Sequence, residues 1–230
     1  MINAARDMII SSIRESLAAS RPFDALHREH HKGNEANARS DETARRSVEL
    51  DANALSETFS KNLESGGGKC TIVGNELAAA RAIQEIIASS GVRRIALSNS
   101  HVVQNLCSSI SGDVEILNKA TSADLFSCDL GITSAQYAIA ETGTLVLESE
   151  RERNRLASLV PPVHICMLDA RDIRQKMIDV LDVLQQNGRE NLSRAVTFIT
   201  GPSRTSDIEL TLAIGVHGPR ELYVIVINNA

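Results

Sequence analysis

The segment VTFITGPSRTSDIELTLAIGVHGPR, residues 196–220, decides the fold because it sets a short polar stretch between apolar runs. Residues 195–200 are β-branched and aromatic, which is typical of a buried strand. Gly201 and Pro202 end this strand, since proline has no N–H to donate to a ladder. We therefore expect a polar loop at residues 203–207.

The residues after this loop predict two more strands. Apolar side chains alternate with polar or small ones at residues 208–216, and a period of two is the period of a strand. Residues 215–219 contain two glycines and a proline, which predict a second turn. Residues 222–227 then predict the last strand.

Residues 70–185 predict an α/β fold, because short apolar runs alternate there with helical patterns. This alternation is typical of βαβ units, in which helices flank a parallel sheet. We expect strands at residues 70–73, 94–98, 114–117, 129–133, 144–148 and 163–168, and helices at 76–89, 101–110 and 172–185. Ligands of such sheets bind at the carboxyl ends of strands, so the polar turns are the candidate sites.

Residues 1–65 predict an N-terminal helical arm with a polar linker, ahead of an α/β domain at residues 66–230. Apolar residues at helical spacing flank a charged segment that contains His27, His30 and His31. These histidines have no cysteine nearby, and we interpret them as solvated surface rather than as a metal site.

The composition predicts a globular, cytoplasmic protein without a cofactor. The chain has 230 residues, of which 43% are hydrophobic, enough for a packed core. A net charge of -5 and an aromatic fraction of 3% argue against nucleic-acid binding. No apolar run approaches the roughly 20 residues that cross a bilayer. The four cysteines include no C-x-x-C pair, which favours buried thiols over metal or cluster ligands.

The turn before residues 144–148 is the first candidate for chemistry. Glu141 stands there at the mouth of a strand, where it can act as a nucleophile or a general base, with Thr142, Gly143 and Thr144 beside the ligand. The alternative is an ordinary turn, in which Glu141 is solvated and Gly143 supplies a positive φ.

The loop at residues 203–207 is the second candidate, as an anion site. The guanidinium of Arg204 can hold a carboxylate or phosphate through two hydrogen bonds, and Ser203 and Thr205 can line the same anion, with Asp207 beside them. The alternative is that Arg204 pairs with Asp207 and the hydroxyls stabilise the turn.

Three further residues are singled out by their type and position. Arg155 is a candidate for a second anion contact, although a solvated face is the usual role of such a basic run. His217, in the second turn, is a candidate acid or base near neutral pH. His164 precedes an apolar run, and we interpret it as a core histidine with a hydrogen-bond partner.

Three segments resemble the LUD-domain family of lactate utilisation protein C. They are AIAETGTLVL at residues 138–147, SLVPPVHI at 158–165, and FITGPSRTSDIEL through GVHGP at 198–219. The resemblance implies a Rossmann-like fold of three layers with a parallel or mixed sheet, related to sugar-phosphate isomerases and CoA transferases. It also implies a part in oxidising L-lactate to pyruvate, together with iron–sulfur subunits.

Three functional hypotheses follow. The first is an accessory component of lactate oxidation, without a redox centre, that binds a small carboxylate or phosphate or its partner subunits at a face built from Glu141, Arg204 and His217. The second is an enzyme in which Glu141 attacks an acyl group or isomerises a sugar phosphate. The third is a module that senses a metabolite. The first two require the two polar turns to meet over one edge of the sheet.

Overall fold

A computed structural model describes residue 11 and residues 52–108, 110–118, 120–152, 155–186, 193–208, 211–215 and 218–229. For residues 205–208 and 211–214 it describes the backbone. The chain divides into two compact units, Met1–Glu49 and Leu50–Ala230. The elements below belong to the second unit.

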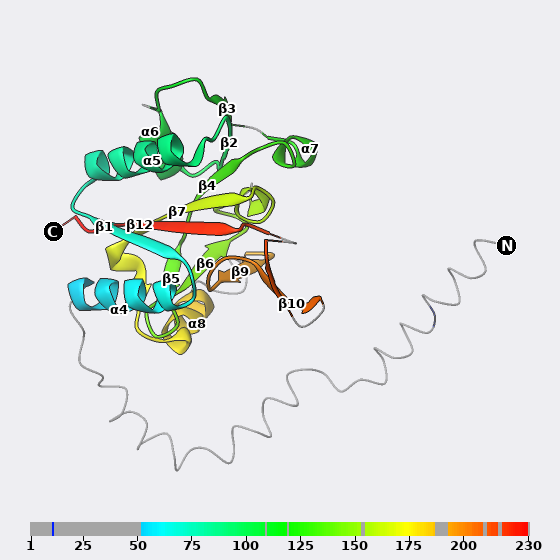
Figure 1. Cartoon of the computed structure of the whole chain (residues 1–230). Helices are drawn as coiled ribbons and strands as arrows, with labels where there is room; N and C mark the ends of the chain where they lie inside the picture. Colours follow the sequence, from blue (N-terminus) through cyan, green and yellow to red (C-terminus); the bar gives the residue numbers. More distant parts are fainter. Residues whose placement is uncertain are drawn as a thin grey trace, which may run out of the picture. The chain divides into compact units, whose positions relative to one another are not determined.

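A six-stranded parallel sheet forms the middle layer, which confirms the predicted α/β class (Figure 1). Its order is β1-β12-β7-β4-β2-β3, and every neighbouring pair is parallel. The strands are β1 (Lys69–Val73), β2 (Arg94–Leu97), β3 (Glu115–Leu117), β4 (Leu130–Ser134), β7 (Val163–Asp169) and β12 (Glu221–Ile227). Both faces of the central strands are covered, which explains why nearly every residue of β4 and β7 is buried.

Helices α5 (Glu76–Ser90) and α6 (His101–Cys107) cover one face of this sheet (Figure 1). In α5 the buried side chains of Ala79, Ile83 and Ile87 recur every four residues, so one stripe of the helix faces the sheet. The side chain of Asn75 caps its first turn, and Gly91 ends it with a φ of 62°. The predicted helix 76–89 is therefore confirmed.

Helix α4 (Ala52–Ser65) and a second, four-stranded sheet cover the opposite face (Figure 1). The order of the second sheet is β8-β5-β6-β9. Its strands are β5 (Tyr137–Ile139), β6 (Thr144–Glu148), β8 (Ile173–Arg174) and β9 (Val196–Ile199). Helix α8 (Met177–Gln186) packs on the outer side of β5 and β6, so that every residue of β6 is buried.

Helix α4 lies in the same compact unit as the sheets, whereas the sequence placed residues 52–65 with the arm. Its side chains Phe59 and Leu63 are fully buried in the core between α4, β12 and β7. The physical reason is that this amphipathic helix packs beside β1 and buries its apolar side chains in the core that β7, β12 and the second sheet share. The two compact units divide between Glu49 and Leu50, and the domain boundary predicted at residue 66 stays a prediction.

The polar stretch after residue 200 folds differently from the prediction. Residues 203–207 do not form a loop, because β10 (Arg204–Ile208) pairs antiparallel with β11 (Thr211–Ile214). The prediction of a single strand at 208–216 is also wrong, because β10 ends at Ile208 and β11 occupies Thr211–Ile214. The alternating pattern runs through both strands of this hairpin and so did not reveal the turn. Strand β9 lies at the edge of its sheet and is half-buried, not buried.

Several short elements and one helix boundary also differ from the prediction. Residues 170–174 form the 3-10 helix η2 (Ala170–Asp172) and β8, so α8 begins at Met177 and not at residue 172. Helix α7 (Ser122–Leu125) and the 3-10 helix η1 (Arg155–Ser158) had no sequence signal strong enough to predict them.

Among the described residues, no helix combines the length and the apolar character that a membrane span needs. The four cysteines are all free. Cys107, Cys128 and Cys166 are buried and Cys70 is half-buried.

Candidate functional site

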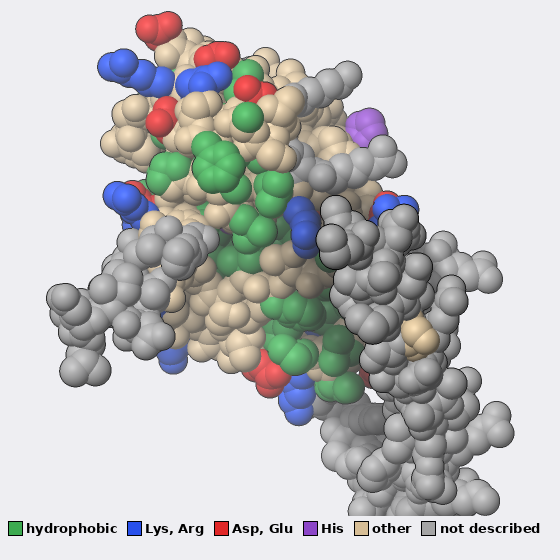
Figure 2. All heavy atoms as spheres, turned by 90° about the vertical axis from the view of Figure 1, so that its right-hand side faces the viewer, with side chains coloured by type: hydrophobic (Ala, Val, Ile, Leu, Met, Phe, Trp, Pro, Cys, Tyr) green, Lys and Arg blue, Asp and Glu red, His purple; other side chains and the backbone are tan. Residues whose placement is uncertain are grey.

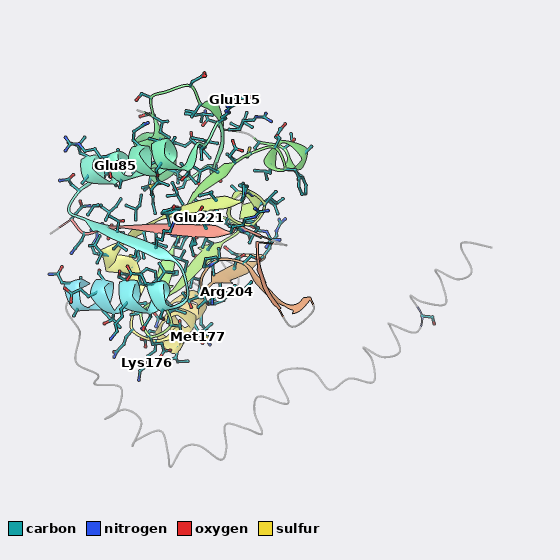
Figure 3. The ribbon with its side chains drawn as sticks, viewed as in Figure 1. Glu85, Glu115, Lys176, Met177, Arg204 and Glu221 are labelled. Carbon is teal, nitrogen blue, oxygen red and sulfur yellow. The ribbon has the colours of Figure 1, made fainter. Side chains whose placement is uncertain are left out.

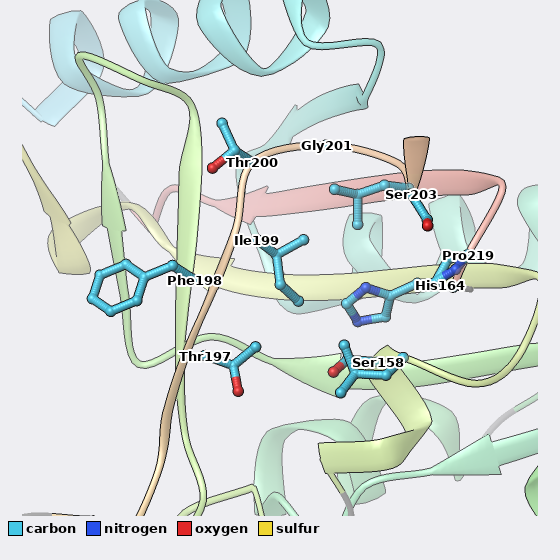
Figure 4. A pocket seen from close by; sticks show the side chains of 12 residues that line it. Ser158, His164, Thr197, Phe198, Ile199, Thr200, Gly201, Ser203 and Pro219 are labelled. Atoms are coloured by element: carbon cyan, nitrogen blue, oxygen red, sulfur yellow. The ribbon is translucent and has the colours of Figure 1, made fainter. Parts of the chain in front are cut away.

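A cavity of about 230 Å³ lies beside the first residues of β7 and β12 (Figure 4). His164 and Leu222, which pair across these strands, form its floor. Its walls come from the end of η1, from β9 with the turn after it, and from the turn before β12. The lining residues outside the floor are Ser158, Leu159, Thr197, Phe198, Ile199, Thr200, Gly201, Ser203, Gly218 and Pro219.

Two of the walls are held together by backbone hydrogen bonds. The N–H of Ser203 donates to the carbonyl of Pro219 at 2.8 Å, and the N–H of Gly215 donates to the carbonyl of Ser203 at 2.9 Å. A Cβ added to Gly218 would lie 3.0 Å from the Cβ of Ser203. The glycine therefore lets the two turns approach closely enough to close one side of the cavity.

His164 presents a neutral imidazole to the cavity. Its Nε2 lies 2.8 Å from Oγ1 of Thr133, which forms the hydrogen bond expected of a core histidine. Burial lowers the pKa of His164 to about 3, because the interior disfavours the charged ring. At neutral pH this side chain therefore contributes a polar group without a charge.

Hydroxyl groups supply most of the other polar lining. Ser158, Thr197, Thr200 and Ser203 each place one on the wall, and the oxygen of Ser158 donates to the carbonyl of Arg155 at 2.6 Å. No charged side chain lines the cavity among the described residues. A small anion placed in this cavity would therefore meet neutral hydrogen-bond donors, which are the groups used by other sites built from hydroxyls and backbone N–H groups.

The turn that carries Glu141 packs against α4 and α8. Oε1 of Glu141 accepts a hydrogen bond from the N–H of Met177 at 3.1 Å, at the start of α8. A carboxylate is favourable there, because the first N–H groups of a helix lack partners within the helix. Gly143 has a φ of 64°, and a Cβ there would overlap the backbone of Leu63 in α4. The side chain of Asn62 also donates to the carbonyl of Ala140 at 2.7 Å.

Arg204 contacts the loop that follows α4. Its Nη2 donates to the carbonyl of Gly66 at 2.7 Å, and Figure 3 shows its side chain beside this loop. The same figure shows Lys176 and Met177 farther away, at the start of α8. Glu141 and Arg204 thus have different partners, although both turns touch the last turn of α4 and the loop after it.

A chain of hydroxyl groups connects the Glu141 turn with the cavity. Oγ1 of Thr142 lies 2.7 Å from Oγ1 of Thr144, which lies 2.8 Å from Oγ1 of Thr200 in the cavity wall. The two polar turns therefore meet through threonines. An enzyme that uses Glu141 as a nucleophile stays a prediction, and the contact of this carboxylate with α8 does not favour it.

The remaining predicted site residues divide into two groups. Ser203 lines the cavity, and Arg155 is exposed on η1. His217 and the side chains of Thr205 and Asp207 lie outside the described residues. Sequence reasoning did not single out Ser158, Thr197 or Thr200 as site residues, yet these hydroxyls lie in or directly beside segments that resembled the family.

A wider groove of about 460 Å³ adjoins the cavity and shares Leu159 and Gly218 with it. Its other lining residues are Phe126, Val160, Pro162, Gly215 and Arg220. The side chain of Phe126 is 81% exposed. Figure 2 shows the side of the molecule that carries α7, on which apolar side chains gather in a band. A large exposed aromatic residue beside an apolar groove is typical of an interaction surface.

Comparison with known proteins identifies the family. The LUD domain matches residues 56–227, which contain both sheets, most of α4 and the cavity. The chain belongs to the LUD-domain family. The crystal structure of a DUF162 family protein from Deinococcus radiodurans superimposes with a TM-score of 0.59 at 26% identity, and the match covers 77% of this chain and 99% of the other.

Two curated relatives match a shorter region. Lactate utilization protein C of Deinococcus radiodurans is 41% identical over 106 residues, 46% of this chain and 49% of that protein. An uncharacterised protein of Neisseria meningitidis serogroup B is 45% identical over 101 residues, 43% of this chain and 42% of its own length. The chain thus matches less than half the length of these relatives.

Proposed function

We propose that this LUD-domain protein is an accessory component of the oxidation of L-lactate to pyruvate, and that it binds a small carboxylate in the cavity of His164 and Ser203. The observation that carries the proposal is that the family-like segments around residues 158–165 and 198–219 converge on this one cavity. The similarity to a protein named lactate utilization protein C supports the metabolic context.

The size and lining of the cavity favour a metabolite of a few carbon atoms. Cavities for drug-sized ligands measure about 300 to 1,000 Å³, and this one is smaller. Hydroxyl groups and a neutral imidazole can hold the carboxylate, while Leu159, Ile199 and Leu222 offer an apolar wall to a methyl group. L-lactate and pyruvate both combine a carboxylate with a methyl group.

The buried cysteines favour an accessory role over that of a redox centre. Burial raises the pKa of the Cys107 thiol to about 12 and also raises that of Cys166. These thiols are therefore harder to deprotonate than exposed cysteines, whereas the ligands of an iron–sulfur cluster are thiolates. In this proposal the electrons pass through iron–sulfur partner subunits, and the present chain assists them in the cytoplasm.

The groove around Phe126 is the described surface that best suits such partners. Burying an exposed phenylalanine beside Leu159 and Val160 removes apolar area from water, which favours association. The change Phe126→Ser is expected to abolish co-purification with the iron–sulfur subunits from cells grown on L-lactate. The matched change Leu77→Ser, at a side chain 64% exposed on α5, is expected to leave co-purification intact. Equal capture by both variants would contradict this part of the proposal.

Growth tests the metabolic role. Deleting the gene is expected to abolish growth on L-lactate as the carbon source and to leave growth on glucose unchanged. A plasmid copy of the wild-type gene restores growth on L-lactate. Unimpaired growth of the deletion strain on L-lactate would refute the role.

Thermal unfolding tests whether the protein binds L-lactate or pyruvate. A ligand at 100 times its Kd stabilises the native state by about 2.7 kcal/mol, which raises the Tm of a chain of this size by roughly 5 to 10 °C. L-lactate or pyruvate is expected to produce such a rise. Ser203→Ala is expected to raise the Kd about fivefold, since one hydrogen bond is lost, whereas Ser89→Ala, on exposed surface of α5, leaves it unchanged. A wild-type Tm that neither compound moves would refute binding.

A further inference from the structure

The central sheet has a second feature, at the ends of its strands away from the cavity. From β2 the chain continues to β3 on one side and then returns to β4 on the other side of β2. The strand order therefore reverses between β2 and β4. In open parallel sheets the carboxyl ends of the strands at such a reversal form a crevice in which ligands bind.

Polar side chains gather at this position. Ser98 follows β2 and Ser134 ends β4. The carboxyl group of Glu152 accepts hydrogen bonds at Oε1 from the N–H of Ser134 at 3.0 Å and from its hydroxyl. The hydroxyl of Ser134 also lies 2.9 Å from that of Ser100, whose N–H donates to Oγ of Ser98 at 3.3 Å. Glu152 and Ser98 are fully buried, and Ser100 and Ser134 are half-buried and give the cluster its access to solvent.

One atom of the cluster lacks a partner. Oε2 of Glu152 is buried and accepts no well-aligned hydrogen bond among the described residues, although the nearby hydroxyl of Ser98 acts to lower the pKa of this carboxyl group. Native proteins rarely leave a buried polar atom in this state, because its lost hydration is not replaced.

Glu148, the other buried glutamate on this segment, provides a contrast. Its Oε2 accepts a hydrogen bond from Ser193 at 3.1 Å. Its Oε1 also has no hydrogen-bond partner among the described residues, but the guanidinium of Arg151 lies 3.6 Å from it. The chain thus places a cation beside Glu148, while no ion pair joins Glu152 to a described residue.

We propose that Glu152, Ser98, Ser100 and Ser134 form a binding site for a small polyhydroxylated molecule, separate from the cavity of His164. A hydroxyl group both donates and accepts hydrogen bonds, so several neighbouring hydroxyls match three serines and one carboxyl group. Burial raises the pKa of Glu152 because the interior disfavours its charged form, and a buried carboxyl group with no cation beside it suits a neutral ligand better than an anion. One ligand hydroxyl satisfies Oε2, the atom that the chain leaves without a partner.

Saturation-transfer NMR with glycerol and erythritol tests this site on the full chain, with 1-propanol as a control that lacks neighbouring hydroxyls. The wild type is expected to bind both polyols at millimolar concentration and to bind 1-propanol at least about tenfold more weakly. Glu152→Leu is expected to raise the Kd for erythritol about tenfold or more. Glu152→Gln keeps one donor and one acceptor and is expected to stay within about threefold of the wild type.

Matched controls separate this site from the first one. Glu150→Gln makes the same chemical change on an exposed glutamate and is expected to leave polyol binding unchanged. Pyruvate has no hydroxyl group, so its binding reports on the cavity of His164 and also verifies that Glu152→Leu is folded. If that variant does not fold, Ser134→Ala takes its place with the same expected loss. Polyol binding that is absent from the wild type, or equal in the wild type and in the folded variant, would overturn the proposal.

Discussion

Gly143 shows how a single residue joins two elements. It adopts a φ of 64°, and a Cβ there would overlap the backbone of Leu63. Gly143→Ala is expected to lower the free energy of unfolding by about 2 to 4 kcal/mol, because it adds backbone strain and displaces α4. Gly74→Ala is the control, since a Cβ at Gly74 meets no atom within 4 Å. Urea unfolding measures both, and equal stability of the two variants would contradict this role of Gly143.

His164 makes the stability of the protein depend on pH. Its pKa is about 3 in the folded chain and 6.5 ordinarily, so between these values the unfolded chain holds a proton that the folded chain does not. The free energy of unfolding therefore falls as the pH falls from 6.5 toward 3, by up to about 1.4 kcal/mol per pH unit from this group.

His164→Gln tests this dependence, because glutamine can keep the hydrogen bond to Thr133 without titrating. Glu152 titrates with the opposite sign: its raised pKa stabilises the folded chain at low pH, and this contribution is lost as the pH rises above 4.5. Since both proteins retain Glu152, the difference between their unfolding curves isolates His164. Identical slopes between pH 4 and 6.5 would rule out the linkage.

For single residues, the sequence predicted the chemical type of the site side chains better than it predicted their hydrogen-bond partners. It indicated that the turn of Glu141 and the stretch of Arg204 were polar and close to strand ends. It did not indicate that Glu141 contacts α8 or that Arg204 contacts Gly66, because these partners lie far away in the chain. The unpartnered oxygen of Glu152 was equally hidden, since burial depends on the packing of several elements.

Among the elements, α4 decides whether the second face of the sheet is covered. Leu63 is fully buried against this face, whereas Leu77 on α5 is 64% exposed. Leu63→Ala is expected to lower the free energy of unfolding by about 2 to 5 kcal/mol, and Leu77→Ala by less than about 0.5 kcal/mol. Unfolding in urea measures the free energy of unfolding of both variants. A loss at Leu63 no larger than at Leu77 would mean that α4 is dispensable for the core.

The strands of the central sheet were predictable, and the hairpin was not. β7 and β12 are covered on both faces, so their sequences are mostly apolar and stand out from their surroundings. Side chains alternate between the two faces in a single strand and also in each strand of a hairpin. The alternating pattern of residues 204–214 therefore does not show where β10 ends and β11 begins. Helix α8 was predicted too early because its periodic pattern begins inside η2 and β8.

The whole molecule places its two proposed sites at opposite ends of one parallel sheet. The cavity of His164 lies beside the first residues of β7 and β12, and the cluster of Glu152 lies at the last residues of β2 and β4. Each site therefore includes residues at the ends of strands in this sheet, so neither site is built from loops alone. Both belong to the unit Leu50–Ala230, so this unit is expected to bind ligands without the preceding residues.

Two truncations test the extent of this unit. The chain of residues 50–230 is expected to unfold cooperatively within about 2 °C of the full chain and to bind pyruvate with the same Kd. The chain of residues 66–230 lacks Phe59 and Leu63, whose burial contributes about 3 to 6 kcal/mol of a total stability of about 5 to 15 kcal/mol. It also exposes the apolar surface of β12 and β7 that α4 covers, so it is expected to lose cooperative unfolding and pyruvate binding together. Circular dichroism melts and ligand titration measure both properties, and a cooperative melt of residues 66–230 at the Tm of the full chain would show that the fold does not require α4.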